Sequence, residues 1–240
     1  MGNEKQYAEL AAILAGAERM VFLGGAGVST GSGIPDFRSV DGLYHQKFDY
    51  PPEVIISHSF YLRDPAYFFR FYREKMLPLG FEPNITHRKL AQWEQEGKLA
   101  AVVTQNIDGL HQKAGSRTVY ELHGSVLRNY CTKCRKFYSA EFIRDSKSIP
   151  RCSCGGIVKP DVVLYEEGLD QDTVEKSIMA IRDADLLMVA GTSLTVYPAA
   201  GLLRYYRGNR LVLINRDATL YDGEADLVIH DSLGSVFSQL

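Results

Sequence analysis

The sequence has few cysteines, and they are unevenly placed. Only four occur among 240 residues, and all of them lie between Cys131 and Cys154. This excludes a disulfide framework spread along the chain, and in a reducing compartment such a cluster favours a bound metal. The chain also has no apolar run near the roughly 20 residues that a membrane-spanning helix needs, so we expect no membrane partner.

The sequence also lacks a strong excess of charge of either sign. Its 27 Lys and Arg residues nearly balance its 29 Asp and Glu residues, which argues against direct nucleic-acid binding. Residues 1–5 are polar and contain no cationic segment followed by an apolar one, so we expect no signal peptide and a cytoplasmic location. The length is sufficient for one large core, or for a main domain with a small satellite.

Short apolar runs alternate with segments of helical periodicity. The runs predict strands at 20–23, 99–103, 118–122, 162–165, 185–190, 211–214 and 226–229. Helices are predicted at 4–16, 65–76, 85–98, 169–182 and 197–207. Asn84 is expected to cap the third helix, with Ile85, Leu90 and Trp93 on its inward face. The alternation is typical of a doubly wound parallel sheet in an α/β protein, whose ligands bind at the carboxyl ends of the strands.

Polar residues gather where two of these strands end. Gln105, Asn106 and Asp108 follow the strand at 99–103, and His123 follows the strand at 118–122. Because the carboxyl ends of neighbouring parallel strands meet at one edge of a sheet, these side chains are expected to face one crevice. A histidine titrates near neutral pH and suits a general base. The alternative is structural, since Asn and Asp are ordinary turn formers and a histidine before a glycine is commonly a loop residue.

A glycine-rich segment follows the first strand. Residues 24–38 read GGAGVSTGSGIPDFR, and glycines there allow a tight turn in which backbone N–H groups approach a phosphate. Asp36, Phe37 and Arg38 at its end are suited to meet a ribose, cover a nicotinamide and pair with charge. Thr30 stands where a strict dinucleotide fingerprint has a glycine. The alternative is an ordinary turn in which Asp36 and Arg38 form a surface ion pair.

The four cysteines form two close pairs. Cys131 and Cys134 are separated from Cys152 and Cys154 by seventeen residues. Each pair fits a tight turn whose thiolates converge, and two such turns complete a tetrahedral site of four sulfurs for Zn²⁺. A metal with four thiolate ligands keeps no open position, so we expect one structural zinc ion in the chain.

With these motifs identified, the chain closely resembles the sirtuins, the family of NAD-dependent protein deacylases. The matching elements occur in the family's order and span nearly the whole chain, at 25–29, 33–38, 104–111, 122–124, the four cysteines, 191–194 and 196–198. The resemblance implies a Rossmann-like large domain made of residues 1–30, 77–124 and 161–240. It also implies a small domain in which residues 31–76 form a helical module and residues 125–160 form a zinc-binding module.

The resemblance implies that NAD and an acetyl-lysine peptide meet between these two domains. The acetyl oxygen would attack the nicotinamide ribose carbon as nicotinamide leaves, giving an alkylimidate. His123 is implied as the general base on a ribose hydroxyl, with Asn106 as the second catalytic residue. The products are nicotinamide, O-acetyl-ADP-ribose and deacetylated lysine. NAD is thus a co-substrate, and the partner is an acetyl-lysine-containing protein or peptide.

The resemblance also implies the binding residues. The implied NAD contacts are Gly25, Ala26, Gly27, Ser29, Thr30, Ile34, Asp36, Phe37, Arg38, Tyr44, Gln105, Asn106, Ile107, Asp108, His123, Gly191, Thr192, Ser193, Asn215, Arg216 and Leu233. Among them, Asn106 and Asp108 suit the carboxamide of nicotinamide. The segment implied to pair with the extended peptide by β-augmentation consists of Val162, Val163, Leu164 and Tyr165.

Two positions bear on the acyl group and the peptide. After residues 162–165 the family usually has a glycine and then a glutamate, whereas here Glu166 precedes Glu167. A side chain at that place is expected to alter the peptide groove or its charge preference. Family members that remove acidic acyl groups have a Tyr and an Arg three residues apart, where this chain has Phe69 and Tyr72. Because neither is a cation, acetyl or other uncharged acyl groups are expected.

Two other functions stay open at this point. A protein mono-ADP-ribosyltransferase on the same scaffold would cleave NAD and pass ADP-ribose to a protein side chain. The presence of His123 favours deacylation, because the base is needed after nicotinamide leaves. A non-enzymatic NAD sensor or a zinc-ribbon nucleic-acid module is disfavoured by the near-neutral net charge and by the polar residues at the strand ends.

Overall fold

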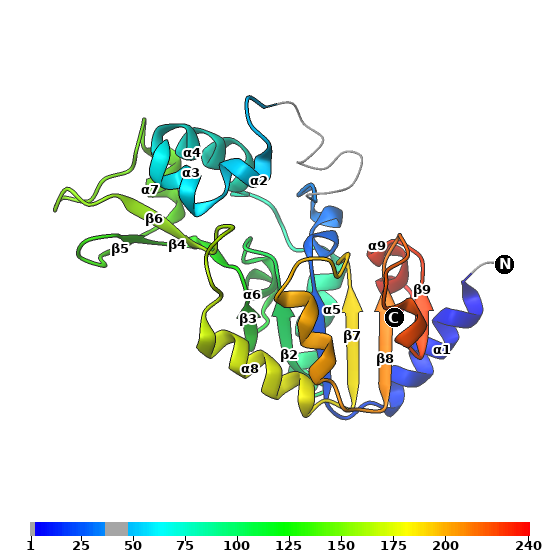
Figure 1. Ribbon diagram of the computed structural model, residues 1–240. Helices are drawn as coiled ribbons and strands as arrows, with labels where there is room; N and C mark the ends of the chain where they lie inside the picture. Colours follow the sequence, from blue (N-terminus) through cyan, green and yellow to red (C-terminus); the bar gives the residue numbers. More distant parts are fainter. Residues whose placement is uncertain (1–2, 37–47) are drawn as a thin grey trace.

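The computed structural model describes residues 3–36 and 48–240 of the chain. Phe37, Arg38 and Tyr44, three of the implied NAD contacts, lie outside the described residues. The described residues form two sheets that lie side by side, a larger one and a smaller one (Figure 1).

The larger sheet is parallel and doubly wound, as the sequence predicts. In the described chain its strands lie in the order β3-β2-β1-β7-β8-β9, and every neighbouring pair is parallel. The strands are β1 (Met20–Gly24), β2 (Leu99–Thr104), β3 (Val119–Glu121), β7 (Leu186–Ala190), β8 (Arg210–Ile214) and β9 (Leu227–Ile229). The order reverses between β1 and β7, and the crevice outside such a switch point is where ligands bind in this kind of sheet.

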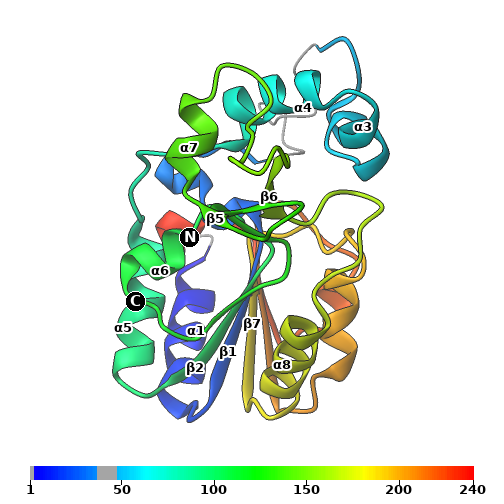
Figure 2. The same ribbon diagram turned by 90° about the vertical axis from the view of Figure 1, so that its left-hand side faces the viewer.

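Helices cover both faces of the larger sheet (Figure 2). They are α1 (Glu4–Gly16), α5 (Ile85–Gln95), α6 (Leu110–Ala114), α8 (Gln171–Arg182), α9 (Leu233–Phe237) and the 3₁₀ helix η5 (Ala199–Tyr205). Three shorter 3₁₀ helices lie in connecting segments: η1 (Ala26–Val28), η2 (Thr30–Ser32) and η6 (Asp222–Glu224). Successive residues of β1 point to opposite faces: Met20 and Phe22 pack with α1, α5 and α9, whereas Val21 and Leu23 pack with α8 and η5. Among the described helices, none has the length and apolar character that crossing a membrane requires.

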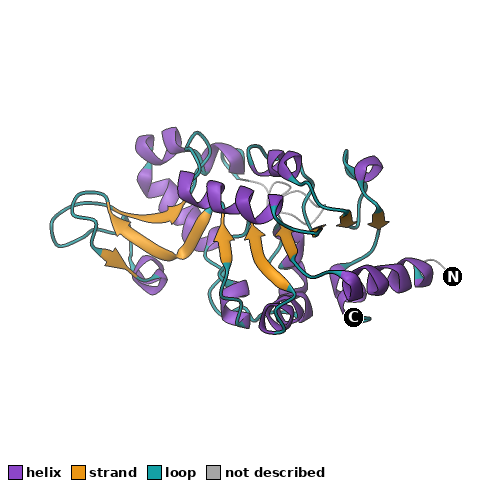
Figure 3. Ribbon diagram, turned by 90° about the horizontal axis from the view of Figure 1, so that it is seen from below, coloured by secondary structure: helices purple, strands orange, loops and turns teal. Residues whose placement is uncertain are grey.

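The smaller sheet is antiparallel and lies beside the larger one (Figure 3). Its strands are β4 (Gly124–Cys131), β5 (Phe137–Tyr138) and β6 (Val158–Val162), with β4 in the middle. The accompanying helices are α2 (Pro52–Ile55), α3 (His58–Arg63), α4 (Pro65–Phe71), its π-helical continuation η4 (Tyr72–Met76) and α7 (Ala140–Asp145). One hydrophobic core joins these helices to the smaller sheet, because Phe60, Phe68 and Tyr72 pack in the same cluster as Val126 and Val158.

The prediction of a main-sheet strand at 162–165 is wrong. Val162 ends β6 in the smaller sheet, and residues 163–165 form no strand, although Tyr165 makes an isolated bridge to Ser57. The actual strand alternates, with Val158, Pro160 and Val162 buried and the polar residues between them half-buried. Proline is rare inside strands, so Pro160 concealed this alternation in the sequence.

The predicted helices are present, with shifted ends and with one residue wrongly assigned to an inward face. The helix predicted at 65–76 is α4 continued by η4, and the Asp64 side chain caps it by accepting from the Tyr67 N–H. Ile85 does not point inward, because it is 40% exposed. Leu90 and Trp93 are buried as predicted, and Thr86 rather than Ile85 lies with them on the buried face of α5.

Candidate active site and metal centre

The glycine-rich turn after β1 packs directly against the loop after β7. A Cβ atom on Gly25 would lie 2.8 Å from the Thr192 Cβ, and one on Gly27 would lie 2.7 Å from the Gly191 Cα. The Gly27 N–H donates to the Gly191 carbonyl oxygen at 2.8 Å. Glycine is therefore required at both positions by the close approach of two backbones at the switch point of the sheet.

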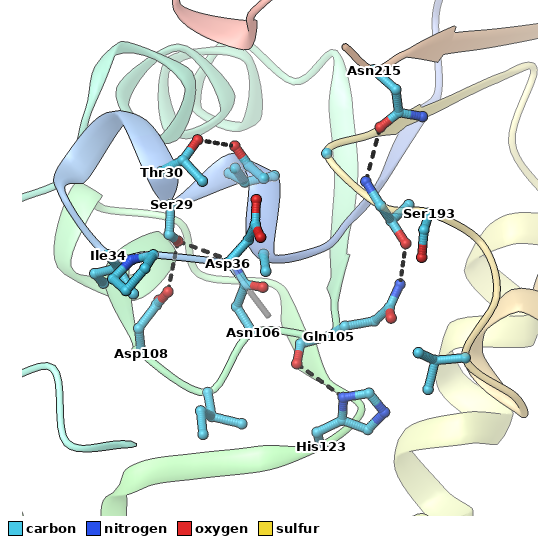
Figure 4. A pocket seen from close by; sticks show the side chains of 18 of the residues that line it. Ser29, Thr30, Ile34, Asp36, Gln105, Asn106, Asp108, His123, Ser193 and Asn215 are labelled. Atoms are coloured by element: carbon cyan, nitrogen blue, oxygen red, sulfur yellow. Dashed lines mark hydrogen bonds between the residues drawn. The ribbon is translucent and has the colours of Figure 1, made fainter. Parts of the chain in front are cut away.

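Three polar side chains meet beside this turn (Figure 4). Asn106 Nδ2 donates to Ser29 Oγ at 3.0 Å, and the Ser29 hydroxyl donates to Asp108 Oδ2 at 2.6 Å. Burial raises the pKa of Asp108, in spite of the hydrogen bonds that it accepts from Ser29 and from the Leu110 N–H. The cluster thus offers an amide and a carboxyl group side by side, the kind of donors and acceptors that a carboxamide can bind.

His123 lies where β3 passes into β4. Its Nδ1 is 3.0 Å from the Gln105 carbonyl oxygen, and since a carbonyl oxygen only accepts, Nδ1 carries the proton and Nε2 keeps its lone pair. Burial lowers the pKa of His123, and the bond to Gln105 opposes this only partly. The imidazole is therefore neutral at pH 7, with Nε2 able to accept a proton.

A chain of hydrogen bonds crosses the switch point from β2 to β8. Gln105 Nε2 donates to Thr192 Oγ1, and the Thr192 N–H donates to Asn215 Oδ1, both at 2.9 Å. Asn215 Nδ2 is buried and has no hydrogen-bond partner in the described part of the chain. A buried donor left without a partner costs free energy, so this end of the site suits a polar ligand that satisfies it.

These groups line one cavity of about 690 Å³. Of the described residues implied in NAD or peptide binding, only Gly25 is not in its wall. The others line it: Ala26, Gly27, Ser29, Thr30, Ile34, Asp36, Gln105, Asn106, Ile107, Asp108, His123, Val162, Val163, Leu164, Tyr165, Gly191, Thr192, Ser193, Asn215, Arg216 and Leu233. Asp36 also pairs with Arg216 at 3.5 Å.

The cavity wall includes residues that the sequence did not point to. Asn84 caps α5 as predicted, but its Nδ2 also donates to the Val28 carbonyl oxygen at 2.7 Å and to Ser32 Oγ at 3.0 Å. A capping side chain thus holds the glycine-rich turn. Ile56 and Met76, from the helices over the smaller sheet, form another part of the wall. Nothing in their sequence neighbourhood beyond a general abundance of aromatic residues marks them.

The four cysteines lie together, and none of them lines the described cavity wall. Their Sγ atoms all lie within 4.8 Å of one another, with Cys131 and Cys154 3.4 Å apart and Cys134 and Cys152 3.6 Å apart. A Cβ atom on Gly156 would lie 2.5 Å from the Cys131 Sγ, so glycine lets the second turn approach the first. Four convergent thiolates with no open position are consistent with the one structural zinc ion that the sequence predicts.

Known proteins are similar to this chain in sequence and in fold. A sequence model of the Sir2 family matches residues 25–198. The chain belongs to the Sir2 family. This Sir2 chain is 60% identical over 232 residues to a Clostridium acetobutylicum protein named NAD-dependent protein deacetylase, and the match covers 95% of each chain. A protein of the same name from Clostridium perfringens is 56% identical over 236 residues, with 97% of each chain covered.

Solved Sir2 structures have the same fold. A Sir2 complex with a p53 peptide and NAD⁺ is 38% identical to this Sir2 chain, with a TM-score of 0.86 that covers 100% of this chain and 97% of that one. A Sir2 protein bound to an acetylated peptide is 36% identical, with a TM-score of 0.85 over 97% and 95% of the two chains. The sirtuin resemblance and the Rossmann-like α/β fold with a smaller sheet beside it are thereby confirmed.

Proposed function

We propose that this Sir2 chain is an NAD-dependent protein lysine deacetylase. Its substrates are NAD and an acetyl-lysine-containing protein or peptide, and its products are nicotinamide, O-acetyl-ADP-ribose and the deacetylated lysine. The observation that carries the proposal is the neutral His123, whose unprotonated Nε2 belongs to the same cavity as Asn106 and Asp108. The names of the two Clostridium relatives support it.

The polar groups of the cavity fit NAD. Asn106 and Asp108 match the amide and carbonyl of a nicotinamide carboxamide. At the other end, the buried Nδ2 of Asn215 is a donor in need of an acceptor, such as a ribose or adenine atom. When bound, NAD supplies a ribose carbon that is electrophilic as nicotinamide leaves and that takes up the acetyl oxygen.

His123 and its neighbours would then move one proton. Nε2 takes the proton of a ribose hydroxyl, and the Nδ1–H keeps its bond to the Gln105 carbonyl oxygen, which stabilises the imidazolium that forms. Burial favours the neutral ring before that step, so the base is ready across the neutral pH range. Asn106, held by Ser29, orients the carboxamide of the nicotinamide that leaves.

We infer that the peptide lies along residues 162–165. The Val163 N–H donates to the His123 carbonyl oxygen at 3.0 Å, whereas the Val163 carbonyl accepts no hydrogen bond from the described residues. An extended peptide that pairs there would bring its acetyl-lysine close to His123. The nearby wall is apolar at Ile56, Met76 and Ile107, which favours acetyl or another uncharged acyl group.

Mass spectrometry of a panel of acyl peptides, with and without NAD, tests the proposal. We expect the acetyl group to be lost only when NAD is present, with one nicotinamide released per peptide. Labelled NAD that leaves ADP-ribose on protein would favour a mono-ADP-ribosyltransferase, and NAD binding without any product would favour a sensor. The cytoplasmic location and the lack of direct nucleic-acid binding stay predictions from the sequence.

A further inference from the structure

Glu166 has a backbone conformation that residues with a side chain rarely adopt. Its φ is 75°, in the left-handed region where Cβ crowds the backbone. The sirtuins usually have a glycine at this place, and glycine adopts such a φ without strain. A glutamate here costs folding free energy, which contacts of its side chain must offset.

Both oxygens of the Glu166 carboxylate bind Ser59 in α3. Oε2 accepts from the Ser59 N–H at 2.8 Å, and Oε1 accepts from the Ser59 hydroxyl at 2.9 Å. The neighbouring backbone is joined to the same segment, since the Tyr165 N–H donates to the Ile56 carbonyl at 3.1 Å and the His58 N–H donates to the Tyr165 carbonyl at 3.0 Å. Side chain and backbone thus tie one loop to the start of α3.

The next residue, Glu167, adds a second tie. Its carboxylate accepts from the Leu164 N–H at 2.9 Å and from Lys159 Nζ at 3.2 Å, and it lies 2.7 Å from His58 Nδ1. Two adjacent carboxylates therefore hold residues 163–167 against residues 56–59.

This loop borders the cavity beside His123 and contains most of the proposed peptide edge. An edge that is ordered before the peptide arrives loses less conformational entropy when the peptide binds. We propose that Glu166 is a positioning residue that clasps this loop to Ser59 and so pre-forms the edge that receives the acetylated peptide. The inference rests on the proposed function, because it assigns the loop to peptide binding.

A carboxylate at the cavity rim could instead select peptides that carry Lys or Arg beside the acetyl-lysine. Both of its oxygens already accept hydrogen bonds from Ser59, so the geometry points to the clasp. Glu166→Gln separates the two roles, since an amide oxygen still accepts from Ser59 while the charge is gone.

Steady-state kinetics of the full chain provide the test, with one acetyl peptide of neutral sequence and one with Arg beside the acetyl-lysine. In Glu166→Ala we expect the KM for both peptides to rise about 3- to 10-fold, while kcat and the KM for NAD stay within about twofold. Glu166→Gln should stay within about twofold of the parent. Ser59→Ala should add little to Glu166→Ala, because both remove the same contact. Glu175→Ala is the control, an exposed carboxylate that accepts from Gln171 on α8.

An unchanged peptide KM in Glu166→Ala would overturn the clasp, and so would fully additive effects of Glu166→Ala and Ser59→Ala. A loss confined to the Arg-containing peptide and shared by Glu166→Gln would show charge selection instead. Absence of NAD-dependent deacetylation would refute the proposed function but not the clasp. Hydrogen exchange of the free chain tests the clasp independently of activity. Faster exchange of the Tyr165 amide in Glu166→Ala supports the clasp, and equal exchange contradicts it.

Discussion

The larger sheet and the smaller cysteine-bearing sheet are stabilised in different ways. The larger one buries continuous apolar strands on both faces: Leu187 and Leu213 pack on one face, and Met188 and Val212 pack on the other. The smaller one is antiparallel, and its core combines aromatic rings with the buried Cys131 and Cys152. We expect a zinc ion bound by the four cysteines to contribute much of the stability of this region.

The two regions also divide the work at the cavity. The polar side chains that suit NAD, together with His123, come from loops at the carboxyl ends of the larger sheet, whereas the helices over the smaller sheet contribute apolar wall such as Ile56 and Met76. The groups suited to the chemistry and the cysteines suited to the metal therefore belong to separate parts of the chain. Loss of zinc should therefore leave the larger sheet folded, and replacement of His123 should leave the zinc content unchanged.

Removal of the metal should have the largest effect on stability. The loss of structure should be confined to the smaller region. Cys131→Ser leaves three thiolates, and apparent zinc binding in small zinc peptides is worth about 10–16 kcal/mol. We expect loss of zinc, fast hydrogen exchange in β4 and β6, and loss of peptide turnover, while β1 and β7 stay protected. Metal analysis and hydrogen exchange check this. Thr132→Ala in the same turn is the control, and full protection of β4 without metal would contradict the prediction.

A side chain at Gly124 should break the joint between the two sheets. Its φ is 75°, and a Cβ atom there would overlap the Asp161 carbonyl oxygen. We expect Gly124→Ala to lower the free energy of unfolding by about 2–4 kcal/mol and to displace the neighbouring His123, so that turnover falls as well. Urea unfolding and kinetics measure both effects. Gly16→Ala, where nothing lies within 4 Å of the new Cβ, should be near neutral, and equal effects of the two variants would refute the steric account.

Acid should weaken the larger region through a buried pair of histidines. The rings of His87 and His111 lie 4.8 Å apart beside Phe22, and burial lowers their pKa values to about 4 and about 3, with Arg88 adding to the effect on His87. Since the folded pKa values lie below the unfolded value of about 6.5, the unfolded state binds more protons in acid. Stability is therefore full above about pH 6.5 and falls as the pH drops toward 4.

His111→Leu tests this source of acid sensitivity. Between pH 6 and pH 4.5 we expect the free energy of unfolding to fall less steeply with pH in the variant than in the parent. The two slopes should differ by up to about 1.4 kcal/mol per pH unit, because one group that binds a proton only in the unfolded state is removed. Urea unfolding of the variant and the parent at several pH values measures the difference, and acid effects on the zinc cluster cancel in it. Equal slopes for the two chains would contradict the assignment.

Loss of the Asn84 side chain should have a smaller effect that distinguishes a site residue from an ordinary cap. We expect Asn84→Ala to cost about 1 kcal/mol of stability and to weaken NAD binding several-fold, because Nδ2 also holds the Val28 carbonyl of the glycine-rich turn. The control is Asp170→Ala, which removes the cap of α8 outside the cavity wall. It should lose similar stability without any change in NAD affinity, as calorimetry and unfolding can show. A parallel loss of affinity in both would refute the second role.

The sequence predicted the larger region better than the smaller one, for physical reasons. A strand such as β1 is buried on both faces and is therefore a continuous apolar run in the sequence. Because the strands are parallel, the polar loops that follow them lie at one edge of the sheet. In the smaller sheet the alternation of β6 runs through Lys159, Pro160 and Asp161, so a polar strand resembled a loop. The cysteine cluster was predictable because ligand spacing is local.

Contacts between segments that are distant in the sequence could not be predicted from it. The second role of Asn84 depends on how close α5 lies to the glycine-rich turn, and local spacing does not give that distance. The sequence marks Glu166 only as a departure from the family pattern, and its two bonds to Ser59 join residues 107 positions apart. Such contacts depend on packing, which the periodicity of a segment does not contain.

The most direct test of the proposed function is replacement of His123 in the larger region. His123→Ala removes the base and leaves Gln105, Asn106 and Asp108 in place to bind NAD. We expect NAD-dependent loss of the acetyl group, followed by mass spectrometry, to fall about 10²- to 10⁴-fold, while NAD affinity, zinc content and melting temperature stay close to the parent. Turnover that persists undiminished in the folded His123→Ala chain would contradict the account.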